Sequence, residues 1–522
     1  MSPADSSGDL LELVRVACAG EPGQAAMIFE DGVVVSRGEL WAQAQSFAGY
    51  LRSRVEPGDR VAVMMGNRAE FMIAWLAAVA CRAVLVSLNP AARSHDAGHI
   101  LRDSGARVAV VSQDREAFFR EMQGDCPALA DIVVAGGDEP RGLAGFRGEP
   151  PGERPADAAG DITNVYYTSG TTGPPKGCMV GHDYWTRFAD LVTGLYGITS
   201  SDRMLCCLQF FYNDPPWQLL MSLLAGTPLV VMRKFSVSRY WSVVRDHDVT
   251  VLFGIASTAS LLLKAPAGER DPGHRVRLAI QVGIPAPLHG ELVARWGVPW
   301  VEAYGLTETG LIVCMPAECA AEMIGSGSIG RACPGTEIRI VSADDTDLTH
   351  GEVGEIVVRA PGLMRGYLNR PGATAQTCRG GWLHTGDLGS RDSRGFLYFR
   401  GRIKDIIRRA GENIAAAEVE NVLRSHPRVL EAAAVPVPDA LLGEEVKVHV
   451  LLTDGETAQS VPPGELIAFG ESRLARYKVP RFLEYRTADF DRTPSMRVKK
   501  ESLDRSGGQS PGVWDRMAEL GW

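Results

Sequence analysis

The sequence has no block of basic residues and no apolar run long enough to cross a bilayer. Its 522 residues include 54 Lys and Arg against 63 Asp and Glu, a net charge of −9, so it lacks the basic footprint of a nucleic-acid-binding protein. The richest apolar stretch, Phe71 to Cys81, is ended by Arg82 and is shorter than the roughly 20 residues that a membrane helix needs. The first residues, MSPADSSGDLLELV, lack the basic start and apolar core of a secretory signal. We therefore expect no nucleic-acid partner, no membrane span and no secretion.

The cysteines form no CxxC pair. There are ten of them at irregular spacings, and Cys206 and Cys207 stand side by side in an apolar run. This distribution is typical of reduced, mostly buried thiols rather than of a disulfide framework or a zinc site. It predicts a protein of the reducing cytoplasm.

Length and composition indicate an ordinary globular protein with more than one domain. Apolar residues make up 45% of the chain and charged residues 22%. From Gly58 the segments GDRVAVMMGN, EFMIAWLAAVACRA and VLVSLNP predict a strand, a helix and a strand, and ARVAVVSQD predicts a further strand. Alternating units of this kind predict an α/β fold with a parallel sheet.

A domain boundary is expected near FRGRIKD, which ends at Asp405. The compact strand and helix signals after it predict a small α/β module, so we divide the chain into 1–402, 403–505 and a tail, 506–522. The tail begins as a flexible linker and ends in a short amphipathic helix, with no function that the residues reveal.

The segment TNVYYTSGTTGPPKG has the composition of a phosphate-binding loop. A predicted strand ending at Tyr167 runs into Gly, Ser and Thr residues and then Lys176. Glycines let backbone N–H groups approach an anion, hydroxyls add donors, and lysine adds positive charge. It is not a Walker A loop, because no GK[ST] closes it and two prolines precede Lys176. The alternative is a mobile surface turn.

This loop resembles the signature loop of the adenylate-forming superfamily, which comprises acyl-CoA synthetases, peptide-synthetase adenylation domains and luciferases. The resemblance covers roughly residues 25 to 505. EAYGLTETG resembles the motif in which an aromatic residue stacks on adenine, a threonine meets the α-phosphate and a glutamate holds magnesium. These residues would be Tyr304, Thr307 and Glu308.

Two later motifs complete the resemblance. GWLHTGDLG resembles the segment whose aspartate binds the ribose hydroxyls, which would be Asp387. GRIKDIIRRAGENI resembles the hinge segment, with Arg402 near the ribose and Lys404 as pivot. Separately these residues have structural alternatives: Tyr304 could be a core aromatic and Asp387 a turn-former. Their shared order and spacing instead reproduce one reaction centre.

The resemblance implies a large, multi-sheet N-terminal domain, a small mobile C-terminal α+β lid, and the active site between them. It implies ATP and Mg²⁺ as cofactors, with Lys176 and Glu308 offsetting phosphate charge. The ATP-binding residues would be Thr168, Ser169, Gly170, Thr171, Thr172, Gly173, Gly283, Ile284, Pro285, Ala303, Tyr304, Gly305, Asp387 and Arg402.

The implied reaction has two steps. A carboxylate attacks the α-phosphate of ATP, pyrophosphate leaves, and the acid becomes an acyl-adenylate with AMP as a good leaving group. The lid then turns about Lys404 for transfer to a second acceptor. Gly411 would let the pantetheine arm of CoA pass close to the backbone, although an ordinary turn glycine explains it equally well. A carrier-protein arm is an alternative acceptor.

The chain departs from the family at TPSMRVKK, where relatives carry a Thr-Gly-Lys whose lysine acts in adenylation. Direct alignment puts Arg497 at that lysine, and a planar guanidinium is not equivalent to a lysine point charge. In an extended strand Lys499 would face the same side about 6.6 Å further on and could substitute. Lys500 would face the other side, in solvent.

The segment FFYNDPPWQ occupies the place of one wall of the acid pocket. Tyr212 and Trp217 hint at a flat aromatic acid, although large side chains also line most cores. Asp214 could meet an amino substituent of the substrate, or it could be a helix N-cap followed by proline in the first turn. The cap is the preferred interpretation.

The leading hypothesis is an ATP-dependent ligase that converts a small acid, aromatic and unsaturated acids among the candidates, into an acyl-adenylate and then an acyl-CoA thioester. A rival keeps the first chemistry: a diazotase of secondary metabolism would use ATP and nitrite on an aryl amine. A third hypothesis is a nucleotide-sensing scaffold that has lost turnover. The oligomeric state is not readable from the sequence.

Overall fold

The computed structural model describes residues 8–136, 142–152, 160–168, 175–265, 273–492, 498–508 and 510–519. The first predicted unit is present as strand β3 (Arg60–Met64), helix α3 (Ala69–Ala80) and strand β4 (Val84–Ser87). Strand β3 pairs in parallel with β4 and with β5 (Val108–Ser112). Every residue of α3 is buried, which explains why its sequence is apolar on all sides rather than amphipathic.

These strands belong to a seven-stranded sheet in the described chain, with the order β18-β8-β7-β4-β3-β5-β6. Its remaining members are β6 (Asp131–Ala135), β7 (Ile162–Thr168), β8 (Lys176–Gly181) and β18 (Gly366–Tyr367). Strands β7 and β8 form a hairpin whose last pair is Thr168 with Lys176.

A second sheet, of 14 strands in the described parts of the chain, has the order β16-β17-β20-β21-β15-β14-β13-β12-β11-β9-β10-β1-β2, with β19 beside β20. Strands β13, β12, β11, β9, β10 and β1 pair in parallel, and the strands from β14 to β21 pair antiparallel. The strand bounds are β1 Ala25–Phe29, β2 Val34–Ser36, β9 Met204–Cys206, β10 Leu229–Val231, β11 Val251–Ile255, β12 Leu278–Val282, β13 Trp300–Leu306, β14 Gly310–Cys314, β15 Ser328–Ala332, β16 Glu337–Val341, β17 Gly354–Arg359, β19 Cys378–Arg379, β20 Trp382–Arg391 and β21 Leu397–Arg402.

A third sheet, of six strands among the described residues, is built entirely from the C-terminal region. Its strands are β22 Ile406–Arg409, β23 Glu412–Ala415, β24 Val429–Asp439, β25 Gly443–Leu452, β26 Phe482–Arg486 and β27 Val513–Asp515. Helices α12 and α13 help to bury a separate apolar cluster on this sheet that includes Ile407, Val419 and Leu483. The C-terminal region therefore has its own core.

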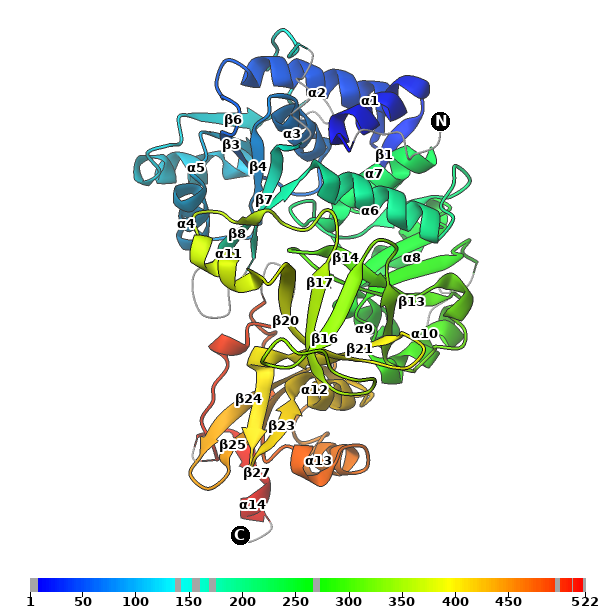
Figure 1. The fold of residues 1–522 in the computed structure, drawn as a ribbon, viewed down its shortest axis with the longest axis vertical. Helices are drawn as coiled ribbons and strands as arrows, with labels where there is room; N and C mark the ends of the chain where they lie inside the picture. The colour runs from blue at the N-terminus through cyan, green and yellow to red at the C-terminus, as the bar shows by residue number, and fades with distance from the viewer. Residues whose placement is uncertain are drawn as a thin grey trace.

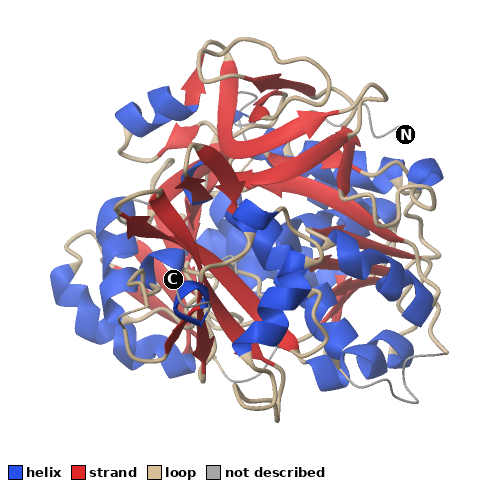
Figure 2. Ribbon diagram, turned by 90° about the horizontal axis from the view of Figure 1, so that it is seen from below, coloured by secondary structure: helices blue, strands red, loops and turns tan. Residues whose placement is uncertain are grey.

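Helices cover the sheets, and Figure 2 shows the strands inside with helices around them. Figure 1 shows the C-terminal region below the larger N-terminal part. The fold is thus the predicted α/β architecture, with a large N-terminal region and a smaller C-terminal one. The helices not yet given are α1 Leu10–Gly20, α2 Arg37–Leu51, α4 Ser94–Ser104, α5 Glu116–Met122, α6 His182–Leu195, α7 Asp214–Ala225, α8 Val237–Asp246, α9 Ala256–Lys264, α10 Ala286–Trp296, α11 Pro371–Thr377, α12 Ala416–Arg424, α13 Pro463–Glu471 and α14 Arg516–Glu519.

The tail does more than the expected linker and helix. Strand β27 adds to the edge of the third sheet by pairing antiparallel with β26, and Trp514 packs against the C-terminal core. Arg481 forms ion pairs with Asp439 and Asp515, which fasten the tail to the sheet. Helix α14 spans only four residues.

Two further expectations concern cysteines and membranes. All ten cysteines are free thiols and most are buried, as predicted. In the parts of the chain that the structure describes, no helix combines the length and the apolar character needed to cross a membrane.

Candidate active site

The predicted nucleoside residues meet at the carboxyl end of β13. Tyr304 lies on β13 with its ring buried, and its hydroxyl donates to Asp387 Oδ2 at 2.8 Å. Asp387 on β20 pairs in register with Arg402 at the end of β21, and Arg402 Nε lies 3.1 Å from Asp387 Oδ1. Ligands of α/β sheets bind outside the carboxyl ends of parallel strands, which is where this trio lies.

Asp387 is 2% exposed, so its carboxyl group is surrounded by protein. Burial raises the pKa of this carboxyl, while Arg402 and the Tyr304 hydroxyl oppose the shift. Oδ1 forms the ion pair with Arg402 but makes no hydrogen bond to the described residues. A buried acceptor of this kind is available to a hydroxyl group of a ligand.

The predicted adenine wall is held by a residue that the motifs did not identify. Gly283, Ile284 and Pro285 connect β12 to α10, and Gly283 has φ +83°. The backbone N–H groups of Gly283 and Ile284 donate to the two carboxylate oxygens of Glu302, at 2.7 and 2.6 Å. Glu302 is buried on β13, so its carboxylate ties the adenine loop to the strand that carries Tyr304.

The predicted phosphate residues converge on Tyr367, which sequence reasoning also missed. Lys176 Nζ lies 4.3 Å from the centre of the Tyr367 ring, and the Tyr367 hydroxyl donates to Glu308 Oε1 at 2.9 Å. Tyr367 thus links Lys176 to Glu308, the predicted magnesium ligand. In the sequence, Tyr367 lies 191 positions after Lys176. A lysine over an aromatic face is a cation–π contact.

The other phosphate residues are placed in part. Thr168 ends β7 beside Lys176, whereas Ser169, Gly170, Thr171, Thr172 and Gly173 lie outside the described residues. Ala303 and Gly305 lie on β13 beside Tyr304, and a side chain at Gly305 would collide with the backbone of Gly310. The carbonyl of Thr307 accepts from the Cys178 thiol at 3.7 Å.

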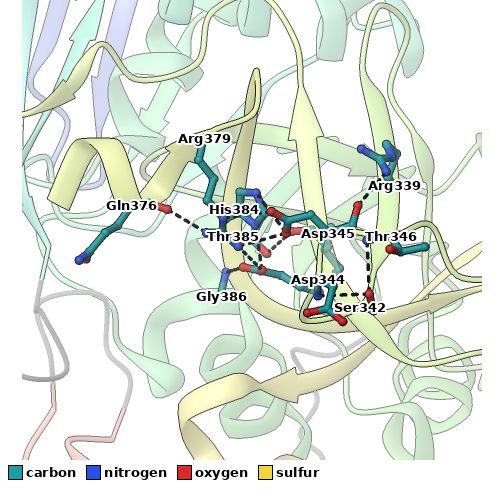
Figure 3. Close-up of polar contacts among 12 residues, drawn as sticks. Arg339, Ser342, Asp344, Asp345, Thr346, Gln376, Arg379, His384, Thr385 and Gly386 are labelled. Atoms are coloured by element: carbon teal, nitrogen blue, oxygen red, sulfur yellow. Dashed lines mark hydrogen bonds and ion pairs between the residues drawn. The ribbon is translucent and has the colours of Figure 1, made fainter. Parts of the chain in front are cut away.

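A polar network supports the turn that presents Asp387 (Figure 3). The carboxylate of Glu355 on β17 accepts from the Gly386 N–H at 2.9 Å and lies 2.9 Å from His384 Nδ1. Arg379 forms ion pairs with Glu355 at 3.6 Å and with Asp345 at 3.3 Å. Glu355 therefore holds the two residues that flank the turn before Asp387.

Thr385 completes this support. Its hydroxyl donates to the Ile356 carbonyl at 2.7 Å and accepts from the Asp387 N–H at 3.1 Å. The backbone of Asp387 is therefore fixed independently of the bond from Tyr304.

The predicted hinge follows β21. Lys404 lies in a short 3₁₀ turn, Ile403–Asp405, with Nζ 3.9 Å from Glu501 Oε1. Burial and the neighbouring Arg402 lower the pKa of Lys404. Lys264 at the end of α9 donates to the Arg424 carbonyl of α12 at 3.1 Å, a contact between the N-terminal and C-terminal regions.

Gly411 lies in the tight turn between β22 and β23. Ala410 has φ +51° and Gly411 has φ +83°, the pattern of a two-residue hairpin turn with positive φ at both positions. A Cβ on Gly411 would meet no atom within 4 Å. The turn accounts for the glycine, and the CoA-tunnel role stays a prediction.

The C-terminal lysines differ from expectation. Arg497 lies outside the described residues, and Lys499 precedes a 3₁₀ turn, Lys500–Ser502, rather than lying in a strand. Val498 forms an antiparallel bridge with Arg492, so the substitution of Lys499 for the family lysine stays a prediction. Lys500 is not solvated as expected, because its Nζ forms an ion pair with the buried Glu420 at 2.6 Å.

The acid-pocket segment leads into α7. Trp217 is buried and stacks on Phe188 with ring centres 4.6 Å apart, whereas Tyr212 is partly exposed. The N-cap prediction for Asp214 was wrong: the cap position is Asn213, and Asp214 is the first helical residue without a capping hydrogen bond.

Comparison with known proteins agrees with this geometry. Residues 14–368 match the AMP-binding enzyme family, and residues 418–497 match the AMP-binding enzyme C-terminal domain. A crotonobetaine/carnitine–CoA ligase of Salmonella paratyphi A is 30% identical over 501 residues, which cover 92% of this chain and 96% of the relative.

Two solved structures extend the comparison. The anthranilate CoA ligase AuaEII in complex with anthranoyl-AMP has a TM-score of 0.87 at 23% identity, covering 96% of this chain and 98% of that chain, and so shows the fold. The o-succinylbenzoate CoA synthetase of Bacillus subtilis with ATP and magnesium has a TM-score of 0.80 at 30% identity, covering 94% and 98%.

Fold and site together define an enzyme of the adenylate-forming type. The chain belongs to the AMP-binding enzyme family. The sequence-based identification as an acid-activating ligase is thereby confirmed, and none of these relatives lends support to the diazotase hypothesis.

Proposed function

We propose that this protein joins a small carboxylic acid to AMP and then transfers the acyl group to CoA. The observation that carries the proposal is the convergence of two groups on β13 and the turn after it: Tyr304 with its partners Asp387 and Arg402, and Glu308 with Tyr367 and Lys176. The first group suits a nucleoside and the second a polyphosphate.

The residues of the first group would bind and orient ATP. The Asp387 Oδ1 atom would accept from a ribose hydroxyl, and Arg402 would keep that carboxylate ionised. The ring of Tyr304 and the Gly283–Pro285 segment would enclose the adenine. Alignment of this kind lowers the entropic part of the barrier without forming bonds.

The residues of the second group would offset phosphate charge. Glu308 is the candidate ligand for Mg²⁺, and the described residues contain no cluster of three metal-binding side chains. One carboxylate fits a magnesium ion that is held mainly by substrate phosphates and water. Such an ion, with Lys176, would supply electrostatic stabilisation as pyrophosphate leaves. The loop from Thr168 to Gly173 would add backbone and hydroxyl donors.

The second step would use the region 403–505 as a mobile lid. Lys404 would be the pivot, and Gly411 would lie near the pantetheine arm of CoA. CoA as acceptor is supported by the curated relatives, which are CoA ligases, and a carrier-protein arm remains the alternative acceptor. In adenylation, Arg497 would take the place of the family lysine, with Lys499 as the second candidate.

The ten free cysteines support a reducing cytoplasm as the location of the protein.

The test measures AMP and pyrophosphate release with ATP, Mg²⁺ and a panel of acids, with and without CoA. Acids related to those of the relatives, crotonobetaine, carnitine and o-succinylbenzoate, belong in the panel beside aromatic acids. We expect acid-dependent pyrophosphate release and a thioester only when CoA is present. Absence of pyrophosphate release with every acid would refute the proposal.

A further inference from the structure

Asp214 is a carboxylate without a positively charged partner in the described chain. It is the first residue of α7, and no ion pair or side-chain hydrogen bond reaches it. The titratable groups that its charge affects are tyrosines and cysteines. They are Tyr166, Tyr184, Tyr212, Cys206 and Cys207. An acid in such surroundings has nothing basic to neutralise it.

The start of α7 offers this carboxylate few donors. An acid at a helix N-terminus normally accepts from N–H groups of the first turn. Here the next two residues are Pro215 and Pro216, which have no N–H. The side chain of the actual cap, Asn213, is engaged elsewhere, since it donates to the Tyr184 hydroxyl at 2.8 Å. Among the described residues, the backbone donor that acts on Asp214 is its own N–H.

Burial has a measurable effect on this group. It raises the pKa of Asp214 to about 6, with its own N–H opposing the shift. The residue as a whole is partly exposed, while the residues that follow it, from Pro215 to Leu223, are buried. A positive charge beside the carboxylate would relieve the cost of keeping it ionised.

A second polar side chain lies one turn further along α7. Gln218 is 1% exposed, and neither its amide oxygen nor its amide nitrogen has a hydrogen-bond partner among the described residues. Residues four apart share one face of a helix, so Gln218 and Asp214 lie on the same face. Buried polar atoms without a protein partner are rare, and they indicate a ligand or an ordered water at this face.

We propose that Asp214 recognises a nitrogen-bearing substituent on the acid substrate, either an ammonium group or an amine that donates N–H bonds. This inference rests on the proposed acid-activating function and names the class of acid. The tyrosines around Asp214 suit such a group, because aromatic faces attract a cation and phenol oxygens accept N–H bonds. Asp214 is then a specificity-determining residue, and Gln218 provides a further polar contact on the same helix face.

The experiment compares matched acids that differ only at nitrogen. The first pair is 4-(trimethylammonio)but-2-enoate and its carbon isostere, 5,5-dimethylhex-2-enoate, and the second is 3-aminobenzoate and 3-methylbenzoate. The measurement is the ratio of kcat/KM for each pair by pyrophosphate release. We expect wild type to prefer the nitrogen acid of at least one pair, and Asp214→Asn to lower that ratio by about 10-fold to 100-fold, as for a lost bond to a charged group.

The two pairs distinguish the two sources of the nitrogen chemistry. A loss confined to the first pair identifies recognition of charge, and a loss confined to the second identifies recognition of N–H donors. The matched control is Asp190→Asn, since Asp190 is exposed on α6 and leaves the ratios unchanged. Asp214→Glu keeps the charge and is expected to keep the preference. Ratios that Asp214→Asn leaves unaltered would overturn the inference.

Failure of the proposed function would look different. If no acid supports pyrophosphate release, binding of the same four acids in the presence of ATP is measured by calorimetry. A nitrogen preference that disappears in Asp214→Asn then supports the inference while the ligase reaction fails. An absence of any nitrogen preference in binding would overturn the inference as well.

Discussion

Glu302 offers the sharpest test of how the adenine loop is held. The isosteric change Glu302→Gln keeps the size of the side chain but replaces one carboxylate oxygen by an NH₂ group. In the native protein the two oxygens accept from Gly283 at 2.7 Å and from Ile284 at 2.6 Å. One of these backbone N–H groups would then face another donor and lose its acceptor.

The magnitude follows from this loss. A buried N–H without an acceptor costs about 1–3 kcal/mol. Because Glu302 accepts the N–H bonds of two successive residues of the loop between β12 and α10, we expect much of the cost to appear as a poorly positioned adenine wall. The KM for ATP should rise about tenfold, which corresponds to about 1.4 kcal/mol. The KM for the acid should change little.

The pH dependence of the free energy of unfolding gives a second test of Glu302. Burial raises the pKa of Glu302 from its ordinary 4.5 to about 8, although the two N–H bonds oppose the shift. The folded protein therefore holds the proton more tightly than the unfolded chain does. The stabilisation from this group is complete below about pH 4.5 and is lost as the pH rises through 8, by at most about 1.4 kcal/mol per pH unit. Glutamine does not titrate, so the penalty of Glu302→Gln should be larger at pH 5.5 than at pH 8.

The assays are steady-state kinetics of pyrophosphate release at several ATP concentrations and urea unfolding at the two pH values. Glu318→Gln is the matched control, because Glu318 is exposed in the short 3₁₀ helix Ala317–Cys319. A tenfold change in the KM for the acid with no change for ATP would refute the placement of this loop. A penalty that grows with pH would show that the N–H bonds, rather than burial, control the proton.

Three further changes test other parts of the structure. Glu355→Gln should raise the KM for ATP about threefold to tenfold with kcat nearly unchanged, because the turn before Asp387 loses its carboxylate support. Lys264→Met should speed proteolysis at the hinge, because it removes a hydrogen bond between the N-terminal and C-terminal regions. For Asp202, burial would raise the pKa, but Arg277, the Thr199 N–H and the Thr250 hydroxyl together outweigh it and lower the pKa to about 2. Asp202→Asn should therefore lower the urea midpoint at pH 6, and wild type should lose this stabilisation as the pH falls from about 4 toward 2.

Each of these changes has a control on the surface. Glu318→Gln serves for the glutamate, Lys234→Met for the lysine and Asp190→Asn for the aspartate, since all three are exposed. If Glu355→Gln leaves the kinetics with ATP unaltered, Glu355 does not support the turn before Asp387. If Lys264→Met is cleaved at the wild-type rate, the hydrogen bond from Lys264 to Arg424 does not hold the two regions together. A urea midpoint of Asp202→Asn equal to wild type at pH 6 would contradict the ion-pair argument.

Much of the candidate site could be proposed from the sequence because its residues lie within short motifs. Tyr304 lies near the end of β13, Glu308 in the turn after it and Asp387 within β20, and the order of strands in the sheet brings these segments near one another. Tyr367 could not be predicted in this way, since its contacts with Lys176 and Glu308 depend on β18 pairing with β8 from far along the chain.

The errors have physical reasons that were partly visible in the sequence. Pro215 and Pro216 have no N–H, so an N-cap at Asp214 would have had only the Trp217 N–H of the first turn to accept from. For Lys500 the two-residue period of a strand did not apply, because the chain turns into a 3₁₀ helix there and brings the ammonium group to Glu420. Long-range ion pairs of this kind leave no local pattern.

The most direct test of the account follows ATP in the presence of Mg²⁺, an acid panel and CoA, with AMP, ADP, pyrophosphate and thioester measured together. We expect AMP and pyrophosphate in equal amounts, dependent on the acid, and acyl-CoA when CoA is added. Asp387→Asn should lower this activity by weakening ATP binding. Release of ADP and phosphate in place of AMP and pyrophosphate, or no acid-dependent turnover at all, would contradict the central claim.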